Sequence, residues 1–145
     1  MQDDRLRASL PHAVVRVFRL VNRAHNRALQ PLGLSAEQAH VLSCLWELGP
    51  MTMGRMLPLL ALSSPTLTGA IDRMEAQHLV RRVRDRADGR AWVLEPDPAA
   101  NRKRPKIEST LESVEAACFE GLTMTERREL LRLLDKCAAS LETAS

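Results

Sequence analysis

Aromatic residues are scarce in this chain of 145 residues, which has two tryptophans, two phenylalanines and no tyrosine. A protein that binds single-stranded nucleic acid by stacking bases on aromatic rings is therefore not indicated. No apolar run approaches the roughly 18 residues of a membrane span, and the N-terminus, Met1-Gln2-Asp3-Asp4, is acidic rather than signal-like. We expect a cytoplasmic protein with no membrane partner.

Cysteine is also rare. Cys44, Cys118 and Cys137 are odd in number and widely spaced, which indicates neither a disulfide framework nor a zinc site. The chain has no metal-ligand spacing among its histidines, no Ser-His-Asp order, no paired carboxylates and no glycine-rich phosphate loop. Cys44 near His40, four residues apart on one helix, is the one conceivable nucleophile. We expect no enzymatic activity, no metal and no cofactor.

What the chain does have is an uneven charge. Its length suits one domain with a sizeable core, and its net charge is only +3. Residues 81–106 nevertheless carry nine basic and four acidic groups, whereas the chain from Glu108 onward carries eight acids and four bases. This asymmetry suits an anionic partner at one end of the molecule, although surface charges also cluster by chance.

Hydrophobic periodicity and capping residues divide the chain into six helices and one hairpin. Apolar residues recur at steps of three and four from Leu6 to Ala28, and Ser35 with Gln38 forms a capping box. We therefore predict a mainly α protein with a small β-hairpin, in the order α-α-α-α-β-β-α-α. The expected elements are helices over 5–30, from 35 to 48, over 53–60, from Ser63 or Ser64 onward, from 98 to about 119 and from Thr123 or Thr125 onward, with strands over 80–84 and 90–94.

The fourth helix and the hairpin together are typical of DNA recognition. The helix opens with small hydroxyl residues that fit the major groove, and its N-terminus favours a phosphate. Arginines surround the hairpin tip, where guanidinium groups can enter a narrow minor groove. Each feature alone also occurs as an ordinary helix start or a solvated strand edge. The predicted DNA contacts are Ser64, Pro65, Thr66, Thr68, Gly69, Arg73, Arg84, Arg86 and Arg90.

Three longer motifs extend this pattern. The hairpin carries Asp85-x-x-Asp88-x-Arg90, followed by Ala91-Trp92-Val93-Leu94. The fourth helix carries Ser63-x-x-Thr66-Leu67-Thr68-Gly69-x-Ile71-Asp72-Arg73-Met74-Glu75, and the last helix carries Leu122-x-x-x-Glu126-Arg127-x-x-Leu130-x-x-Leu133-Leu134. With these motifs the chain resembles, over essentially its whole length, the MarR family of winged-helix transcriptional regulators, in which the hairpin is the wing and the fourth helix is the recognition helix.

The resemblance implies a homodimer on a pseudo-palindromic double-stranded DNA operator. The chain would be a single domain over 1–145, with dimerisation helices at 5–30 and 98–145 and a winged helix-turn-helix lobe at 34–96. We expect Asp85, Asp88 and Arg90 to brace the wing, a role that the family pattern implies for the last two.

The sequence departs from the family pattern at four places. Pro58 falls inside the third helix and is expected to kink it, and His78 stands where glycine normally ends the recognition helix. Asp97 between two prolines replaces the usual Leu-Thr entry to the fifth helix, and Asp97 can cap that helix. Pro105 is expected to bend the fifth helix.

We expect a repressor that a small aromatic or anionic effector releases from its operator. His12, Arg16 and His40 could line the effector cleft, with Arg16 holding a carboxylate; they could equally be surface or interface residues. Thiol sensing is not favoured, because the first helix contains no cysteine and Cys44 and Cys137 lie on or beside apolar stripes. The alternative function is a winged-helix protein-interaction module that has lost specific DNA binding, with its partner at the apolar third helix.

Overall fold

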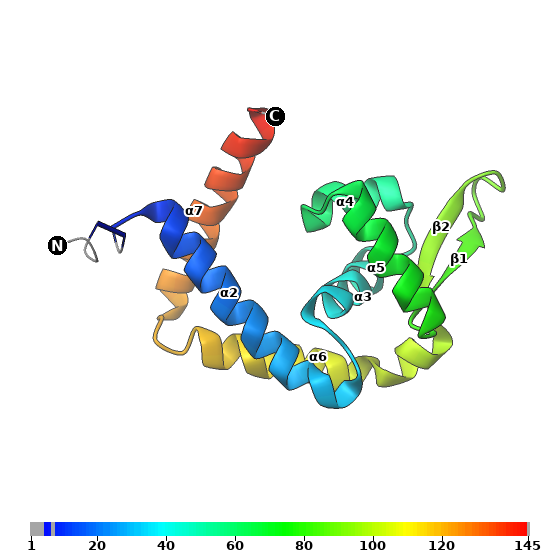
Figure 1. Cartoon of the computed structure of the whole chain (residues 1–145), viewed down its shortest axis with the longest axis horizontal. Helices are drawn as coiled ribbons and strands as arrows, with labels where there is room; N and C mark the ends of the chain where they lie inside the picture. Colours follow the sequence, from blue (N-terminus) through cyan, green and yellow to red (C-terminus); the bar gives the residue numbers. More distant parts are fainter. Residues whose placement is uncertain (1–4, 7, 145) are drawn as a thin grey trace.

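The molecule has two unequal parts joined along one long helix. The computed structural model describes residues 5–6 and 8–144. In Figure 1, α3, α4, α5 and the hairpin form one lobe, while α2 crosses α6 and α7 rises separately from that lobe. The elements are α2 (Leu10–Leu29), η1 (Gln30–Leu32), α3 (Ala36–Leu48), α4 (Met53–Leu60), α5 (Ser64–Ala76), β1 (Val80–Arg84), β2 (Trp92–Pro96), α6 (Pro98–Cys118) and α7 (Met124–Thr143).

The helix starts follow the capping residues that the sequence predicts. Ser35 and Gln38 form a reciprocal capping box at α3, Thr52 caps α4 and Asp97 caps α6. Where the sequence left two candidates, the structure selects Ser63 for α5 and Thr123 for α7. Each cap oxygen accepts a hydrogen bond from a backbone N–H that the first helical turn leaves unpaired.

The first long helix begins later than predicted. We expected one helix from residue 5. Residues 5 and 6 are helical, but α2 begins at Leu10, because the Ser9 hydroxyl accepts from the His12 N–H and Pro11 occupies the first turn. The short η1 turn, which periodicity did not predict, follows α2 and ends at Gly33 in the left-handed conformation, φ +73°. Gly33 thus turns the chain from α2 into α3.

The hairpin has the predicted first strand and a shifted second strand. Val80 pairs with Pro96 and Arg84 with Trp92. The expected start of the second strand at Arg90 is wrong, because Asp88 takes up the N–H groups of Arg90 and Ala91 in the loop. At its other edge β2 exchanges two backbone hydrogen bonds with Met51, at 3.2 and 2.8 Å, and these tie the hairpin to the start of α4.

The hydrophobic core lies inside the lobe that carries α5. The inward stripe of α5, Leu67, Ala70, Ile71 and Met74, is fully buried. It packs against buried residues of α3, α4 and the hairpin, and α6 adds Ile107. Each Å² of apolar surface removed from water stabilises a fold by about 25 cal/mol. The buried inner face therefore fixes α5 in the lobe and leaves its outer face exposed to solvent.

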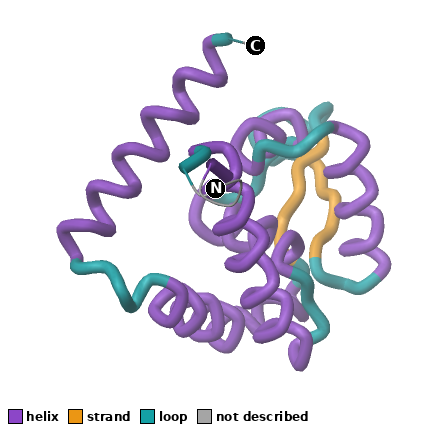
Figure 2. The backbone as a smooth tube through the Cα atoms, turned by 60° about the vertical axis from the view of Figure 1, so that its left-hand side comes forward, coloured by secondary structure: helices purple, strands orange, loops and turns teal. Residues whose placement is uncertain are grey.

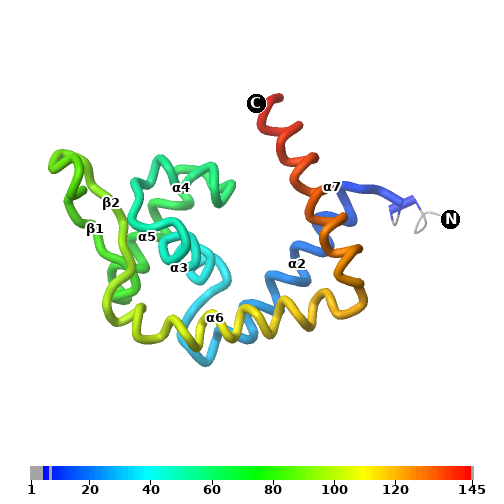
Figure 3. The backbone as a smooth tube through the Cα atoms, turned by 180° about the vertical axis from the view of Figure 1, so that it is seen from behind, coloured from blue at the N-terminus to red at the C-terminus, as the bar shows by residue number. Residues whose placement is uncertain are grey.

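The second part of the molecule is mostly exposed. α2 packs along α6, which runs beneath both parts in the reverse view of Figure 3. In Figure 2, α7 extends away from the other helices after a loop, and no residue of α7 is buried. The apolar stripe of α2 is also open, with Leu10 exposed by 79% and Phe18 by 64%.

Two hydrogen bonds fix how the parts join. The Asn26 side-chain oxygen of α2 accepts from the Ala36 N–H at the start of α3, at 2.8 Å. The Trp46 ring N–H of α3 donates to the Asn101 side-chain oxygen of α6, at 2.7 Å. The lobe is therefore held to both long helices by directional contacts as well as by packing.

The unusual residues flagged in the sequence are accommodated. α4 and α6 run without interruption through Pro58 and Pro105. His78 has φ +54°, the left-handed conformation expected where glycine is usual, and Ala61 has φ +51° at the end of α4. Histidine tolerates this region better than bulky or β-branched residues do, so the turn after α5 is kept without glycine.

Candidate nucleic-acid interface

The start of α5 presents short polar side chains to solvent. Ser64, Pro65, Thr66 and Thr68 are all exposed. The Ser63 and Thr66 hydroxyls lie 2.7 Å apart, and the Thr68 hydroxyl donates to the Ser64 carbonyl at 2.9 Å. These local bonds orient the hydroxyls without burying them, so their remaining lone pairs and protons stay available to base edges or phosphates.

Further along α5, a glycine and an arginine share one exposed face. A Cβ at Gly69 would lie 3.4 Å from the Arg73 Nη1 atom, so the guanidinium extends back over the glycine. The Arg73 Nη2 atom is also 4.0 Å from the Glu37 carboxylate of α3. The missing side chain at Gly69 therefore leaves room both for Arg73 and for a close approach to a groove.

The wing loop is braced by its two aspartates. The Asp85 carboxylate accepts from the Ala87 N–H and the Asp88 carboxylate accepts from the Arg90 N–H, each at 3.0 Å. The Asp85 N–H donates to the Ala91 carbonyl at 2.9 Å and closes the loop. These are side-chain-to-backbone turns of the kind that aspartate favours. Arg90 takes part in them through its backbone and not through its guanidinium.

Arg84 points across the hairpin. Its guanidinium carbon lies 4.0 Å from the centroid of the Trp92 ring, and its Nη1 donates to the Arg90 carbonyl at 2.9 Å. A guanidinium over an indole ring is a favourable cation–π contact. Of the three wing arginines predicted to meet DNA, Arg84 is thus held by the wing itself.

The basic cluster of the sequence separates into paired and unpaired groups. Arg81 donates to Glu95 across the hairpin at 2.6 Å, and Arg82 pairs with acids of α5. Within the described part of the chain, the guanidiniums of Arg86 and Arg90 have no partner, and both residues are exposed. Arg102, Lys103 and Lys106 near the start of α6 are likewise exposed and without a side-chain partner among the described residues. The positive charge free to meet an anion therefore lies at the wing loop and at the start of α6.

Arg82 joins the hairpin to α5, a role that sequence reasoning missed. Its Nη1 lies 2.7 Å from the Glu75 carboxylate and its Nη2 lies 3.0 Å from that of Asp72. In the sequence Arg82 is one base among nine, and no local spacing rule connects it to α5. The one available signal was that Asp72 and Glu75, three residues apart, share a helix face.

The three residues predicted to bind an effector do not meet. No contact joins His12, Arg16 and His40 among the described residues, and the His40 ring instead packs edge-on to His25 of α2, with centroids 5.7 Å apart. Burial lowers the pKa of His40, and the Glu37 carboxylate opposes that shift. Burial, and then the charge of His40, lower the pKa of His25, while Glu115 opposes.

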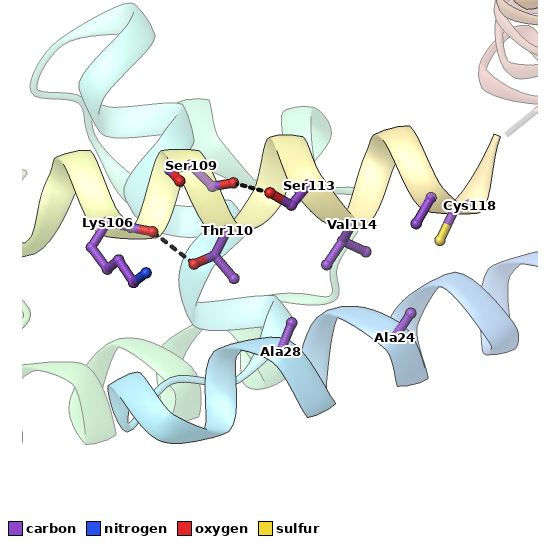
Figure 4. Close-up of a pocket in the computed structure, with 9 residues that line it drawn as sticks. Ala24, Ala28, Lys106, Ser109, Thr110, Ser113, Val114 and Cys118 are labelled. Atoms are coloured by element: carbon purple, nitrogen blue, oxygen red, sulfur yellow. Dashed lines mark hydrogen bonds between the residues drawn. The ribbon is translucent and has the colours of Figure 1, made fainter. Parts of the chain in front are cut away.

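An open pocket on these helices lies elsewhere. It has a volume of about 300 Å³ and lies between α2 and α6, with Ala24 and Ala28 on one side and Lys106 on the other. Figure 4 shows the hydroxyls of Thr110 and Ser113 bonded to carbonyls of their own helix. Small residues on both helices leave this space open, and none of the three predicted effector residues lines it.

The thiols differ in environment. Cys44 is partly buried beside the Met51 sulfur at 3.9 Å, and burial, followed by the nearby Glu47 carboxylate, raises the pKa of its thiol. Cys118 and Cys137 are exposed. A raised pKa lowers the thiolate fraction at neutral pH, so Cys44 lacks the activation that a nucleophile needs.

Comparisons with known proteins decide the family. The MarR family model matches residues 34–92. The HTH-type transcriptional regulator YwoH of Bacillus subtilis is 34% identical over 98 residues, which cover 68% of this chain and 71% of YwoH. The chain belongs to the MarR family. A second relative, the regulator MgrA of Staphylococcus aureus, is 29% identical over 132 residues, covering 90% of this chain and 88% of MgrA.

Solved MarR-family structures have the same fold. A mutant of Escherichia coli MarR complexed with operator DNA superimposes with a TM-score of 0.79 at 22% identity, covering 88% of this chain and 92% of MarR. CouR from Rhodococcus jostii, bound to p-coumaroyl-CoA, gives 0.83 at 25% identity and covers 92% and 94%. The predicted winged-helix fold is confirmed, and family membership makes the protein a transcriptional regulator and not an enzyme, as expected.

A membrane span was also not expected. Between residues 5 and 144, leaving aside Arg7, no helix combines the length and hydropathy that a bilayer crossing requires.

Proposed function

We propose that this MarR-family protein is a homodimeric repressor that binds a pseudo-palindromic operator in double-stranded DNA. The observation that carries the proposal is the pairing of two exposed elements. The polar start of α5 and the arginine-bearing wing belong to one lobe, and Arg82 bonds the wing strand β1 to α5. A helix and a wing held in fixed relation can enter a major groove and reach the adjacent backbone at once.

In this proposal α5 reads bases and the wing binds the backbone or minor groove. Thr66 and Thr68 lie at the N-terminal end of the helix, where side chains come nearest to base edges. Ser64 and Pro65 lie at the first turn, where the positive end of the helix favours a phosphate, and Arg73 reaches a phosphate further along. The free guanidiniums of Arg86 and Arg90 enter or flank the minor groove.

The exposed apolar faces support a homodimer. Leu131 of α7 is exposed by 62%, and Leu134 lies on the same stripe. Leu10 and Phe18 of α2 are exposed as well, and exposed apolar residues along a helix face are typical of a protein–protein interface. We infer that residues 5–30 and 98–145 pair with a second copy, which leaves the lobe over 34–96 to bind DNA in the cytoplasm, where the chromosome lies.

A small anionic effector is the proposed release signal. CouR binds p-coumaroyl-CoA, and the DNA binding of BpsR from Bordetella bronchiseptica is regulated by 6-hydroxynicotinic acid. Arg16 on the exposed face of α2 is the proposed carboxylate partner, with His12 one turn away and His40 at the junction of the lobes. If so, Arg16→Gln abolishes release of DNA by aromatic carboxylates without changing the affinity for DNA.

The test is selection of bound sequences from a random double-stranded pool at near-physiological salt. A two-fold-symmetric motif, whose affinity for the protein falls when Thr66 or Thr68 is replaced by alanine, is the expected result. Each lost base contact costs about 1–3 kcal/mol. A pool without any enriched motif overturns the proposal.

One observation favours the alternative function. Leu59 of α4 is exposed by 51% beside the partly buried Leu57, so this short helix presents an apolar surface to solvent. If selection recovers no motif, the protein is better described as a winged-helix interaction module with its partner at α4.

A further inference from the structure

We propose that Arg84 and Trp92 form a stacked pair, here called the clamp, that holds the wing loop in the orientation that binds DNA. Arg84 is then a positioning residue and not a phosphate contact. This inference rests on the proposed DNA-binding function and revises the assignment of Arg84 made from the sequence. In it, the charges that meet DNA at the wing are those of Arg86 and Arg90.

The clamp lies where the hairpin opens into its loop. Arg84 is the last residue of β1 and Trp92 the first of β2, and the two are directly opposite in the strand register. The guanidinium carbon lies 4.0 Å from the ring centroid, within the roughly 6 Å range of a cation–π contact. Cross-strand pairs of this kind are the unit by which hairpins are stabilised.

A second contact connects the clamp to the loop. The Arg84 Nη1 donates to the Arg90 carbonyl at 2.9 Å. One guanidinium therefore contacts both the Trp92 ring of β2 and the backbone of Arg90, whose own side chain has no partner among the described residues. The Arg90 N–H is fixed by the Asp88 carboxylate at 3.0 Å. Both peptide groups that flank the Cα of Arg90 are therefore held, and the direction of its side chain follows from them.

No core packing holds the loop against the rest of the lobe. None of residues 84–92 is buried, and an exposed loop without packing is usually among the most mobile parts of a protein. Turns made by Asp85 and Asp88 order the loop internally, whereas the Arg84 contacts attach it to the strands. Without the clamp we expect the loop to keep its turns and to swing relative to α5.

The geometry also separates the roles of the arginines. The Arg84 guanidinium already uses its face on the Trp92 ring and its Nη1 on the Arg90 carbonyl, so turning it off the ring toward a phosphate would break both contacts. Arg86 and Arg90 would lose no contact on binding a phosphate, because neither side chain has a partner among the described residues. A ring that is 53% exposed also leaves the clamp accessible to solvent probes.

Salt dependence tests the division of roles. With an operator fragment recovered by selection, dissociation constants are measured over a range of salt for Arg84→Met, Trp92→Leu, Arg86→Met and Arg90→Met. Each phosphate contact contributes about 0.9 to the slope of log affinity against log salt. We expect Arg86→Met and Arg90→Met to lower the slope by about that amount. Arg84→Met and Trp92→Leu should weaken binding about fivefold to tenfold with the slope unchanged.

The double variant completes this experiment. Arg84→Met with Trp92→Leu should bind no more weakly than either single variant, because both changes remove the same clamp. If Arg84→Met lowers the slope by about 0.9 while Trp92→Leu leaves the affinity unchanged, Arg84 is a phosphate contact and the proposal is wrong.

A measurement on the free protein keeps this inference separate from the proposed function. The chain has two tryptophans, so its indole N–H signals in nuclear magnetic resonance are two, and Trp92→Leu identifies one of them. Arg84→Met should move the Trp92 signal and leave that of Trp46, which is bonded to Asn101, in place as the internal control. An unmoved Trp92 signal overturns the clamp even if DNA binding is confirmed, and a moved signal supports it even if no operator is found.

Discussion

Gly69 shows how one missing side chain serves two requirements. It lies inside α5, where glycine weakens a helix by about 1 kcal/mol relative to alanine, yet it leaves space for the Arg73 guanidinium at 3.4 Å from a would-be Cβ. The position therefore sacrifices helix stability for access to the exposed face of α5.

We predict that Gly69→Ala stabilises the protein and weakens its DNA binding. Urea unfolding should show a gain of about 1 kcal/mol, because Arg73 is flexible enough to move away from the added methyl group. The dissociation constant for an operator fragment should rise severalfold, because that methyl group stands on the face proposed to enter the groove. Unchanged affinity in the stabilised variant would show that this face of α5 does not meet DNA.

His25 and His40 predict a pH-dependent stability. Burial lowers the pKa of both residues in the folded state, whereas the unfolded chain binds protons near the usual value of about 6.5. As the pH falls through about 6.5, the unfolded state therefore takes up protons that the folded state resists, and the free energy of unfolding decreases.

Urea unfolding at pH 7.5 and 5.5 measures this effect. His40→Asn should reduce the difference in stability between the two values, both by removing one titrating ring and by relieving its repulsion of His25. His12→Asn, on the exposed start of α2, is the matched control and should leave the difference as it is in the native protein. If the native protein, His40→Asn and His12→Asn all lose the same stability between pH 7.5 and pH 5.5, His25 and His40 are not the source of the pH dependence.

At the scale of elements, Arg82 is the contact that sets the wing against the recognition helix. Its guanidinium bridges Asp72 and Glu75 from β1, and the three side chains are partly exposed. We predict that Arg82→Met lowers the free energy of unfolding by about 1 kcal/mol, a magnitude reduced by solvent screening of the two ion pairs. The loss of DNA affinity should be larger than that, because α5 and the wing no longer approach DNA in fixed relation.

Arg81→Met provides the comparison for that experiment. Arg81 pairs with Glu95 across the hairpin and does not touch α5, so its loss should leave operator affinity within about twofold of the native value. If Arg81→Met and Arg82→Met weaken DNA binding equally, the effect comes from net charge and not from the placement of the wing.

The same elements show what the sequence could predict. Helix starts follow from a single residue and its neighbours, as at Ser35 and Thr52, and both were predicted correctly. The start of β2 was misplaced by two residues because Asp88 draws two N–H groups into the loop. The bonds from Arg82 to α5 and from Trp46 to Asn101 join residues 7 to 55 positions apart, and no periodicity contains that information.

For the whole molecule, the proposed dimer makes a direct prediction. Replacing Leu131 and Leu134 together by glutamate should convert the dimer to a monomer in analytical ultracentrifugation, because charges would then lie in the apolar face of α7. Leu59→Glu, an equally drastic change on an exposed leucine of α4, should leave the dimer intact. Dissociation in both proteins would mean that general destabilisation, and not the α7 face, is responsible.

The open face of α7 has a consequence for how a cell would set the level of this protein. Because no residue of α7 is buried within its own chain, its stability in the proposed dimer comes mainly from the second copy and rises with concentration. Below the dissociation constant of the dimer, the amount of operator-binding species grows as the square of the amount of chain. A twofold change in synthesis would then produce up to a fourfold change in the amount of dimer. Occupancy of the operator would therefore change more steeply than the expression level of the regulator itself.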